Sequence, residues 1–352
     1  MRKSTTAMMA LIATVGGGAV AAHAANITDP NILPILIADY NAIIDGQFNS
    51  TSDTEGPVLI GGDLGPGPAA LNQDDVMLGT TTGTTAITGF GEVNVFGNQT
   101  ALFNSAMGHV LVGGSISSND PPFPGTTSVA SHYAFPPGAT AADNAATFQN
   151  NIWSKITGFS SSLASRTENS TFTPMGEFMP GASVGAGIPA VFDVTLAQLQ
   201  ALGSSTILSF AGCLAATAAT PCDAVINVTG SGTLNQAFLY GFTTAQPNLI
   251  WNFENATDLE INNQWGASIL APDALVHTTA PINGNVIAAT FGGTAPIGSG
   301  ELHLPTFDCG DQLCDAPPVP EPGSLPLLGG ALGLMMVVTV LGAWRRTRLD
   351  LV

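Results

Sequence analysis

A short β-strand pattern bounded by glycines recurs at nearly constant spacing in two parts of this chain. Its segments begin at residues 56, 74, 91 and 108, and again at 267, 284 and 300. In each segment the second and fourth residues after the start are apolar, and a period of two places both on one face of a strand. These pairs are Val58/Ile60, Val76/Leu78, Val93/Val95, Val110/Val112, Ile269/Ala271, Val286/Ala288 and Leu302/Leu304.

The spacing of 16–18 residues predicts a mainly β fold, specifically a β-solenoid (β-helix) in which each turn of the chain adds one short strand. Tight corners between such strands need a positive φ or a close backbone approach. Glycine supplies both, and 41 of the 352 residues are glycine. A β-sandwich is the rival interpretation, but its strands usually recur about every 8–12 residues. The longer spacing favours the solenoid.

One apolar helical stripe interrupts the strand pattern between residues 141 and 164. Its members recur at steps of three or four, the period of one helix face; they are Phe148, Ile152, Ile156, Phe159 and Leu163. We expect a long α-helix packed alongside the solenoid, with Thr140 as its N-cap and Asp143 in its first turn. A second, short helix is expected from 195 to 202, before Gly203.

Charged residues are few and unevenly distributed. They make up 9% of the chain, the formal net charge is −18, and five of the seven Lys and Arg residues lie in the first three or last eight positions. Residues 25–321 hold 24 acidic and two basic residues, Lys155 and Arg166, which is a charge of −22. Binding to nucleic acid needs clustered Lys and Arg, so we expect no nucleic-acid partner. A hydrophobic content of 45% excludes a disordered chain.

The N-terminal residues have the layout of a secretory signal peptide. Arg2 and Lys3 precede an apolar run that closes with Ala22-His23-Ala24, a small-residue pattern that signal peptidase accepts. We therefore expect residues 1–24 to be removed and the mature chain to begin at Ala25.

The C-terminal residues predict a transmembrane helix. Residues 324–344 carry no charge, and at about 1.5 Å rise per residue a helix of this length crosses the hydrocarbon core. Arg345, Arg346 and Arg348 follow. The positive-inside rule therefore places the tail, residues 345–352, in the cytoplasm and the body outside.

The segment before this span resembles a PEP-CTERM sorting signal of Gram-negative bacteria. Val319, Pro320, Glu321 and Pro322 lie in a linker over 311–323 and are followed by the apolar span and the arginines, in the order of that signal. The resemblance implies cleavage by an exosortase, a membrane cysteine protease. It further implies an inner-membrane-anchored precursor whose mature form reaches the cell surface or the exopolysaccharide matrix of a biofilm. A plain membrane anchor is the alternative.

The body, expected as one domain over residues 25–310, resembles the choice-of-anchor A family. The matching residues begin with Asp39-Tyr40-Asn41 and continue through 50–64, 249–253, 268–272, 282–288 and 300–303. This resemblance implies an adhesive domain akin to the ice-binding-like β-solenoids with a helix alongside. It implies no catalytic residues.

The four cysteines form two close pairs: Cys213 with Cys222, and Cys309 with Cys314. Disulfides are the default in an exported chain, and four cysteines allow three pairings. We expect the two local pairs, since neither has the spacing of a zinc site. No cofactor is expected, although Ca²⁺ is a candidate because oxygen ligands surround the second pair; they are Asp308, Asp311 and Asp315.

The sequence contains no recognisable catalytic motif. The histidines of the body are scattered, and neither a metalloprotease motif nor a nucleophile elbow is present; they are His109, His132, His277 and His303. Asp74 and Asp75 are adjacent, so on a strand they face opposite sides and cannot form the facing carboxylate pair of a glycosidase.

We therefore expect a non-enzymatic, exported surface or matrix protein, either an adhesin or an exopolysaccharide-associated structural protein. Signal peptidase and exosortase would be its processing partners, the membrane its anchor before processing, and exopolysaccharide its candidate ligand. The alternatives are a β-helical carbohydrate-active enzyme and an ice- or mineral-interacting surface protein. The threonine-rich run at residues 80–85 motivates the ice-interacting alternative.

Overall fold

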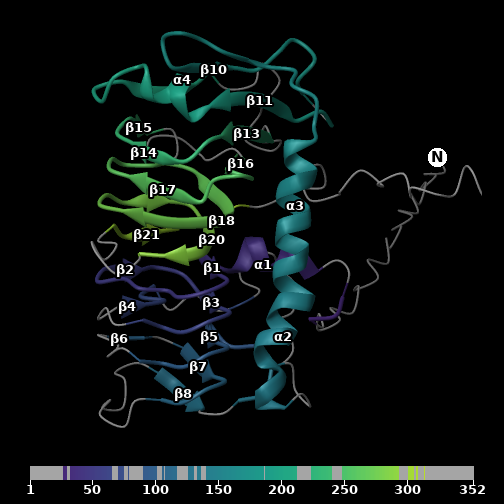
Figure 1. Cartoon of the computed structure of the whole chain (residues 1–352), viewed down its shortest axis with the longest axis vertical. Helices are drawn as coiled ribbons and strands as arrows, with labels where there is room; N and C mark the ends of the chain where they lie inside the picture. The colour runs from purple at the N-terminus through teal and green to yellow at the C-terminus, as the bar shows by residue number, and fades with distance from the viewer. Residues whose placement is uncertain are drawn as a thin grey trace, which may run out of the picture.

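The protein is mainly β, with parallel sheets and few helices (Figure 1). The computed structural model describes residues 27–29, 32–65, 70–74, 78, 90–100, 105–106, 108–116, 126–130, 133–135, 140–185, 187–211, 223–239, 248–292, 300–304, 307 and 313.

The largest sheet is a stack of parallel strands that runs the length of the molecule (Figure 1). Its order is β11-β13-β16-β18-β20-β1-β3-β5-β7-β8, and β17 and β14 extend it beside β18. The strands are β1 Ala42–Ile44, β3 Val58–Ile60, β5 Val93–Val95, β7 Gly108–Val112, β8 Thr126–Ala130, β11 Ala190–Thr195, β13 Ala224–Thr229, β14 Gly232–Leu234, β16 Leu249–Asn252, β17 Asp258–Ile261, β18 Ser268–Thr278 and β20 Val286–Phe291.

Two smaller sheets complete the β-structure. One has the order β19-β21-β2-β4-β6, and the other β15-β12-β10-β9, in which β9 and β10 pair antiparallel. The strands are β2 Asp53–Thr54, β4 Ala70–Leu71, β6 Ser105–Ala106, β9 Thr171–Phe172, β10 Glu177–Met179, β12 Ile207–Phe210, β15 Ala237–Phe238, β19 Ile282–Asn283 and β21 Leu302–His303.

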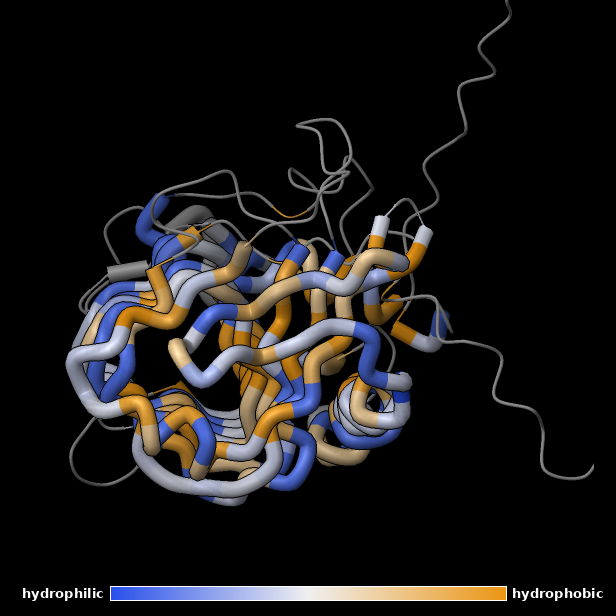
Figure 2. The backbone as a smooth tube through the Cα atoms, turned by 90° about the horizontal axis from the view of Figure 1, so that it is seen from above, coloured by the Kyte–Doolittle hydropathy of each residue, from blue (hydrophilic) through white to orange (hydrophobic). Residues whose placement is uncertain are grey.

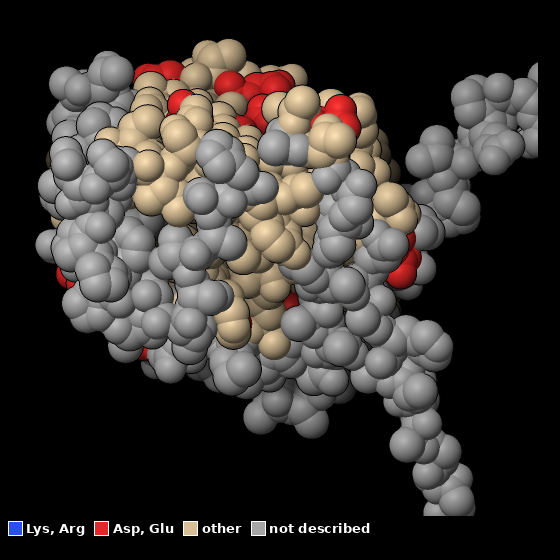
Figure 3. Space-filling view, turned by 90° about the horizontal axis from the view of Figure 1, so that it is seen from below, with Lys and Arg blue, Asp and Glu red and all other residues tan. Residues whose placement is uncertain are grey.

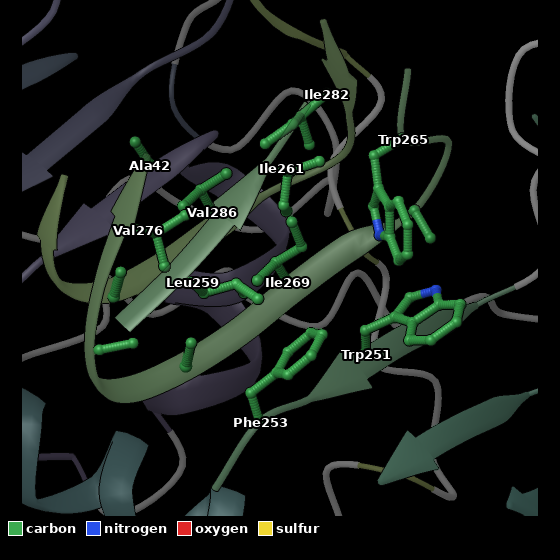
Figure 4. Packing of buried hydrophobic residues seen from close by; sticks show 14 of the residues in the cluster. Ala42, Trp251, Phe253, Leu259, Ile261, Trp265, Ile269, Val276, Ile282 and Val286 are labelled. Atoms are coloured by element: carbon green, nitrogen blue, oxygen red, sulfur yellow. The ribbon is translucent and has the colours of Figure 1, made fainter. Parts of the chain in front are cut away.

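Strands β1 and β3, at the middle of the stack, are buried on both faces, which explains their uninterrupted apolar sequences. In β3, Val58 and Ile60 belong to the inner core, whereas Leu59 belongs to a second cluster on the other face. The register aligns Val58 with Ala42 on one side and with Val93 on the other. The inner core is therefore a column of aligned side chains, part of which is seen in Figure 4. The apolar pairs predicted at 58/60, 93/95, 110/112, 269/271 and 286/288 are confirmed as inward-facing.

A continuous helix over residues 144–164 covers the outer face of the stack (Figures 1 and 2). It follows a 3₁₀ turn, Ala141–Asp143, and comprises α2 Asn144–Phe148, a π-helical turn Gln149–Trp153 and α3 Ser154–Ala164. All five residues of the predicted stripe are buried. A π turn holds one extra residue, so the adjacent Ile152 and Trp153 both face the stack.

The ends of the helices agree only partly with those predicted from the sequence. Thr140 does not accept a backbone N–H as an N-cap; its hydroxyl donates to the Asp143 carboxylate, because the chain enters through a 3₁₀ turn instead. The short helix α4, Leu196–Gln200, begins as predicted. The side chains of Thr195 and Gln198 each accept the other residue's backbone N–H, which is a capping box. It ends before Gly203, whose φ is +77°.

The first and last parts of the chain meet in the middle of the stack. Strand β1 pairs with β3 on one side and with β20 on the other, and β2 pairs with β21 in the smaller sheet. The first half of the chain therefore builds the stack from β1 to β8. The helix returns along its length, and the second half builds from β11 back to β20 (Figure 1). We call the β1–β20 and β2–β21 junction the seam; the helix α1, Ile32–Asp39, precedes it.

Two of the predicted repeat segments do not occupy the expected places. Val58 pairs directly with Val93, so no strand from the segment at 74 lies between them, and Leu78 packs against the outer cluster. Leu302 lies in the smaller sheet, where it pairs with Thr54 and Ile282. The same apolar alternation suits any buried strand, so it did not distinguish one sheet from the other.

Several predicted segments lie outside the described residues: the signal peptide, the four cysteines, the three aspartates around the second pair, the threonine-rich run at 80–85, the PEP motif, the apolar span at 324–344 and the basic tail. In the part of the chain that is described, no helix combines the length and hydrophobicity needed to cross a bilayer.

Candidate functional site

An array of outward polar side chains covers β14, β17 and the second half of β18. The inward residues of these strands, among them Leu234, Leu259, Ile261 and Val276, are buried in the core. Because side chains alternate along a strand, Thr233, Asp258, Glu260, Leu275 and His277 project outward, and exposed polar residues flank the strands at their ends. We call this outward surface the polar face; its side chains are Ser231, Thr233, Asn235, Thr257, Asp258, Glu260, Asn262, His277 and Thr279. In Figure 1, β14 and β17 lie at the left of the stack and α3 at the right.

The polar face is organised in three rows that run across neighbouring strands. The register places Thr233 beside Glu260, and Glu260 beside His277. A second row holds Ser231 and Thr257, and a third holds Asn235, Asn262 and Thr279. Neighbouring strands are about 4.7–4.9 Å apart, so each row repeats its polar groups at this interval.

Hydrogen bonds connect neighbours in each row, except that Glu260 and His277 interact through their charges. The Thr233 hydroxyl donates to the Glu260 carboxylate at 2.7 Å. In the third row, the Asn262 amide donates to Asn235 Oδ1 and the Thr279 hydroxyl donates to Asn262 Oδ1, both at 3.2 Å. The rows are therefore ordered before any ligand arrives.

Electrostatics on the polar face are acidic. The hydrogen bond from Thr233 is the main cause that lowers the pKa of Glu260, and His277 and Asn262 lower it further. Asp258 is exposed on the same strand. The face thus carries negative charge at neutral pH.

A substitution of Thr233 tests whether its hydrogen bond lowers the pKa of Glu260. In Thr233→Val the hydroxyl is lost while the side-chain shape is kept, so the pKa of Glu260 should rise toward its ordinary value of 4.5. In the wild type the lowered pKa stabilises the fold above the ordinary pKa, and this contribution disappears as the pH falls through the folded-state value. An NMR titration of the Glu260 carboxyl carbon measures the shift. Thr257→Val is the control, and an unchanged Glu260 pKa in Thr233→Val would contradict the assignment.

A groove lies next to the polar face, between the end of α3 and strands β11, β13 and β16. It encloses about 350 Å³ and is lined by Ala164, Asp193, Thr195, Asn227, Thr229 and Glu254, among others. Its polar base holds the helix against the stack. Asn227 Nδ2 donates to Asp193 Oδ1 at 3.0 Å and to the Leu163 carbonyl at 3.1 Å.

A second asparagine extends this contact. Asn252 Nδ2 donates to Asn227 Oδ1 at 2.9 Å and to the Ser160 carbonyl at 3.0 Å, while the Ser160 hydroxyl donates to Asn252 Oδ1 at 2.6 Å. The amide groups at the base of the groove are therefore engaged within the protein. Their role is to position the helix.

Both cations of the body contact segments near the chain ends. Lys155 Nζ donates to the Asp29 carbonyl at 2.5 Å, and burial lowers the pKa of Lys155. The Arg166 guanidinium donates to the Leu313 carbonyl at 3.2 Å, and burial likewise lowers its pKa. The two charges hold the N-terminal and C-terminal segments on the helix, and neither lies on the polar face.

The histidines occupy separate places, as the sequence predicted. His109 Nδ1 lies 3.2 Å from Glu92 Oε2, and His303 Nε2 lies 2.8 Å from Glu301 Oε2 at the seam. His303 is half-buried there. His277 is on the polar face, and His132 is outside the described residues. Within the described ranges, no group of three His, Cys, Asp or Glu side chains is arranged to hold a metal ion.

The fold and these surfaces define a class of protein: a parallel-β domain that presents a broad, ordered polar face beside a groove. A family model described as "Putative Ice-binding-like adhesive domain" (pAdhesive_15) matches residues 35–304, which include all the sheets. The chain belongs to this family. No curated protein and no solved structure matches it.

Proposed function

We propose that this protein is an exported cell-surface or extracellular-matrix adhesin whose domain is a β-solenoid. The observation that carries the proposal is the match of an adhesive-domain family to residues 35–304. An adhesive domain indicates a surface protein with a non-enzymatic role. A broad surface suits such a role, because the amides at the base of the groove already bind the protein itself.

The solenoid interpretation is supported by the parallel registers. Val93 aligns with Val110 at a separation of 17 residues, and Ile269 aligns with Val286 at the same separation. Between such strands the chain also contributes to the smaller sheets, as with β2 between β1 and β3. This recurrence is the arrangement that successive turns of a solenoid require.

We further propose that the precursor is exported by its signal peptide, with cleavage after Ala24, and anchored by residues 324–344. An exosortase would then act at Val319–Pro320–Glu321–Pro322. The order of these segments in the sequence supports this route. The oxidising exterior would also favour the disulfides Cys213–Cys222 and Cys309–Cys314.

Cell fractionation tests the proposal. We expect the mature protein on the cell surface or in the matrix of wild-type cells. We expect an unprocessed precursor in the inner membrane of an exosortase-deficient strain, and the same precursor for Glu321→Ala. Glu301→Ala, a change in the folded domain, is the control and should be processed normally. Cytoplasmic protein, or sugar release by the purified protein from a glycan panel, would contradict the proposal.

A further inference from the structure

The polar face presents hydroxyl, amide and carboxylate groups at fixed positions. Its hydroxyl and amide groups lie in three rows whose members are hydrogen-bonded across neighbouring strands. A bonded threonine hydroxyl still has capacity, because one hydroxyl offers one donor and two acceptor positions. The face therefore combines fixed positions with free hydrogen-bonding capacity, which lowers the entropic cost of binding.

The chemistry of the face excludes several kinds of partner. Nucleic acids, anionic membranes and anionic polymers need Lys or Arg, and the two cations of the body are engaged on the helix side. Protein interfaces rely on buried aromatic and large apolar anchors. Among the described residues the exposed large apolar side chains all lie outside this face: Met175, Met179, Ile188 and Ile207.

Neutral and cationic partners remain, and the hydroxyl and amide groups of the face favour a neutral partner rich in hydroxyl groups. Asp258 and Glu260 accept hydrogen bonds from hydroxyls, and carboxylate acceptors make the stronger, charge-assisted bonds. Threonine and asparagine side chains offer both donors and acceptors to the same groups. An extended sugar polymer presents such groups on successive rings, as the rows do on successive strands.

We propose that the polar face binds a neutral, extended polysaccharide that lies along its rows, across β14, β17 and β18. This inference rests on the proposed function and adds to it the binding surface and the ligand class. The rows of Ser231/Thr257 and Asn235/Asn262/Thr279 form the borders of the site. The Thr233–Glu260–His277 row lies between them.

A depletion assay with insoluble polysaccharides tests this proposal. The full chain, in a polyoxyethylene detergent that carries no sugar headgroup, is incubated with cellulose, chitin, covalently cross-linked alginate beads or chitosan. We expect binding to cellulose or chitin that is insensitive to salt, and none to alginate. The double variant Thr257→Val/Thr279→Val should weaken this binding about tenfold, because each lost hydrogen bond contributes modestly.

The matched control is Thr229→Val/Thr167→Val, which makes the same chemical change at two exposed threonines outside the polar face and should bind as the wild type. Equal thermal melting of both variants shows that the fold is intact. Salt-sensitive binding to chitosan alone would overturn the proposal in favour of charge attraction. Equal affinity of both double variants, or binding to none of the polymers, would also overturn it. Cell fractionation tests the proposed function independently of this assay. A protein that reaches the cell surface but binds no neutral polymer would therefore contradict only the polysaccharide proposal.

Discussion

Asn285→Ala is expected to lower the free energy of unfolding by about 2–6 kcal/mol, since several buried polar groups lose their partner and each costs about 1–3 kcal/mol. The side chain of Asn285 is fully buried at the seam. Its Nδ2 donates to the carbonyls of Ile37 and Tyr40 at 2.6 and 2.5 Å. Its Oδ1 accepts from the Ser268 hydroxyl at 2.9 Å and from the Phe307 N–H.

The effect should be large because these contacts join distant parts of the chain. Asn41 makes the reciprocal connection, donating to the carbonyls of Gly284 and His303 at 3.0 and 3.2 Å. The two amides replace the covalent continuity that consecutive turns elsewhere in the stack possess. Losing one of them weakens the junction on which β1 and β20 depend.

Urea unfolding followed by circular dichroism measures this loss. Asn255→Ala is the matched control, because that asparagine is exposed and contacts the neighbouring Glu254. Its change should stay within about 0.5 kcal/mol. If Asn285→Ala were as stable as Asn255→Ala, the seam would not depend on the buried amide.

Trp251→Ala is expected to cost about 3–5 kcal/mol, the usual range for deleting a large aromatic side chain from a core. Trp251 is fully buried, and its ring centroid lies 4.6 Å from that of Trp265 (Figure 4). The Phe178 ring centroid lies 5.2 Å from that of Trp251. Phe238 completes the group at 5.3 Å. The substitution would leave a cavity in the column that supports the second half of the stack.

Trp251→Phe separates ring packing from hydrogen bonding. The Trp251 indole N–H has no hydrogen-bond partner among the described residues, so phenylalanine removes no such bond and retains most of the aromatic contact. We therefore expect a clearly smaller loss than for alanine, measured by thermal melting and urea unfolding. Equal losses for the two variants would show that the column does not depend on this ring packing.

The charge of the body restricts where a ligand can bind. Figure 3 shows acidic side chains on the described part of the lower surface and no Lys or Arg there. The two cations contact carbonyls of the chain-end segments. The net charge of −22 for residues 25–321 therefore describes an anionic surface whose ligand must be neutral or cationic.

The polar face could not have been found from the sequence. Its row partners are 26 or 27 residues apart from β14 to β17, but 17 residues apart from β17 to β18. No constant period connects them. The rows follow from the register of the strands, because the register decides which outward side chains become neighbours.

What the sequence determined by itself was local. Alternation in Val58/Ile60 and Val93/Val95 predicted inward pairs, and the stripe ending at Leu163 predicted the long helix, because both periods depend on residues close in the chain. Only the tertiary structure decided which strands are neighbours. Backbone hydrogen bonds are alike for every strand, so no local pattern reveals that Ala42 pairs with Val286 across 244 residues. The seam and the polar face both follow from that non-local pairing.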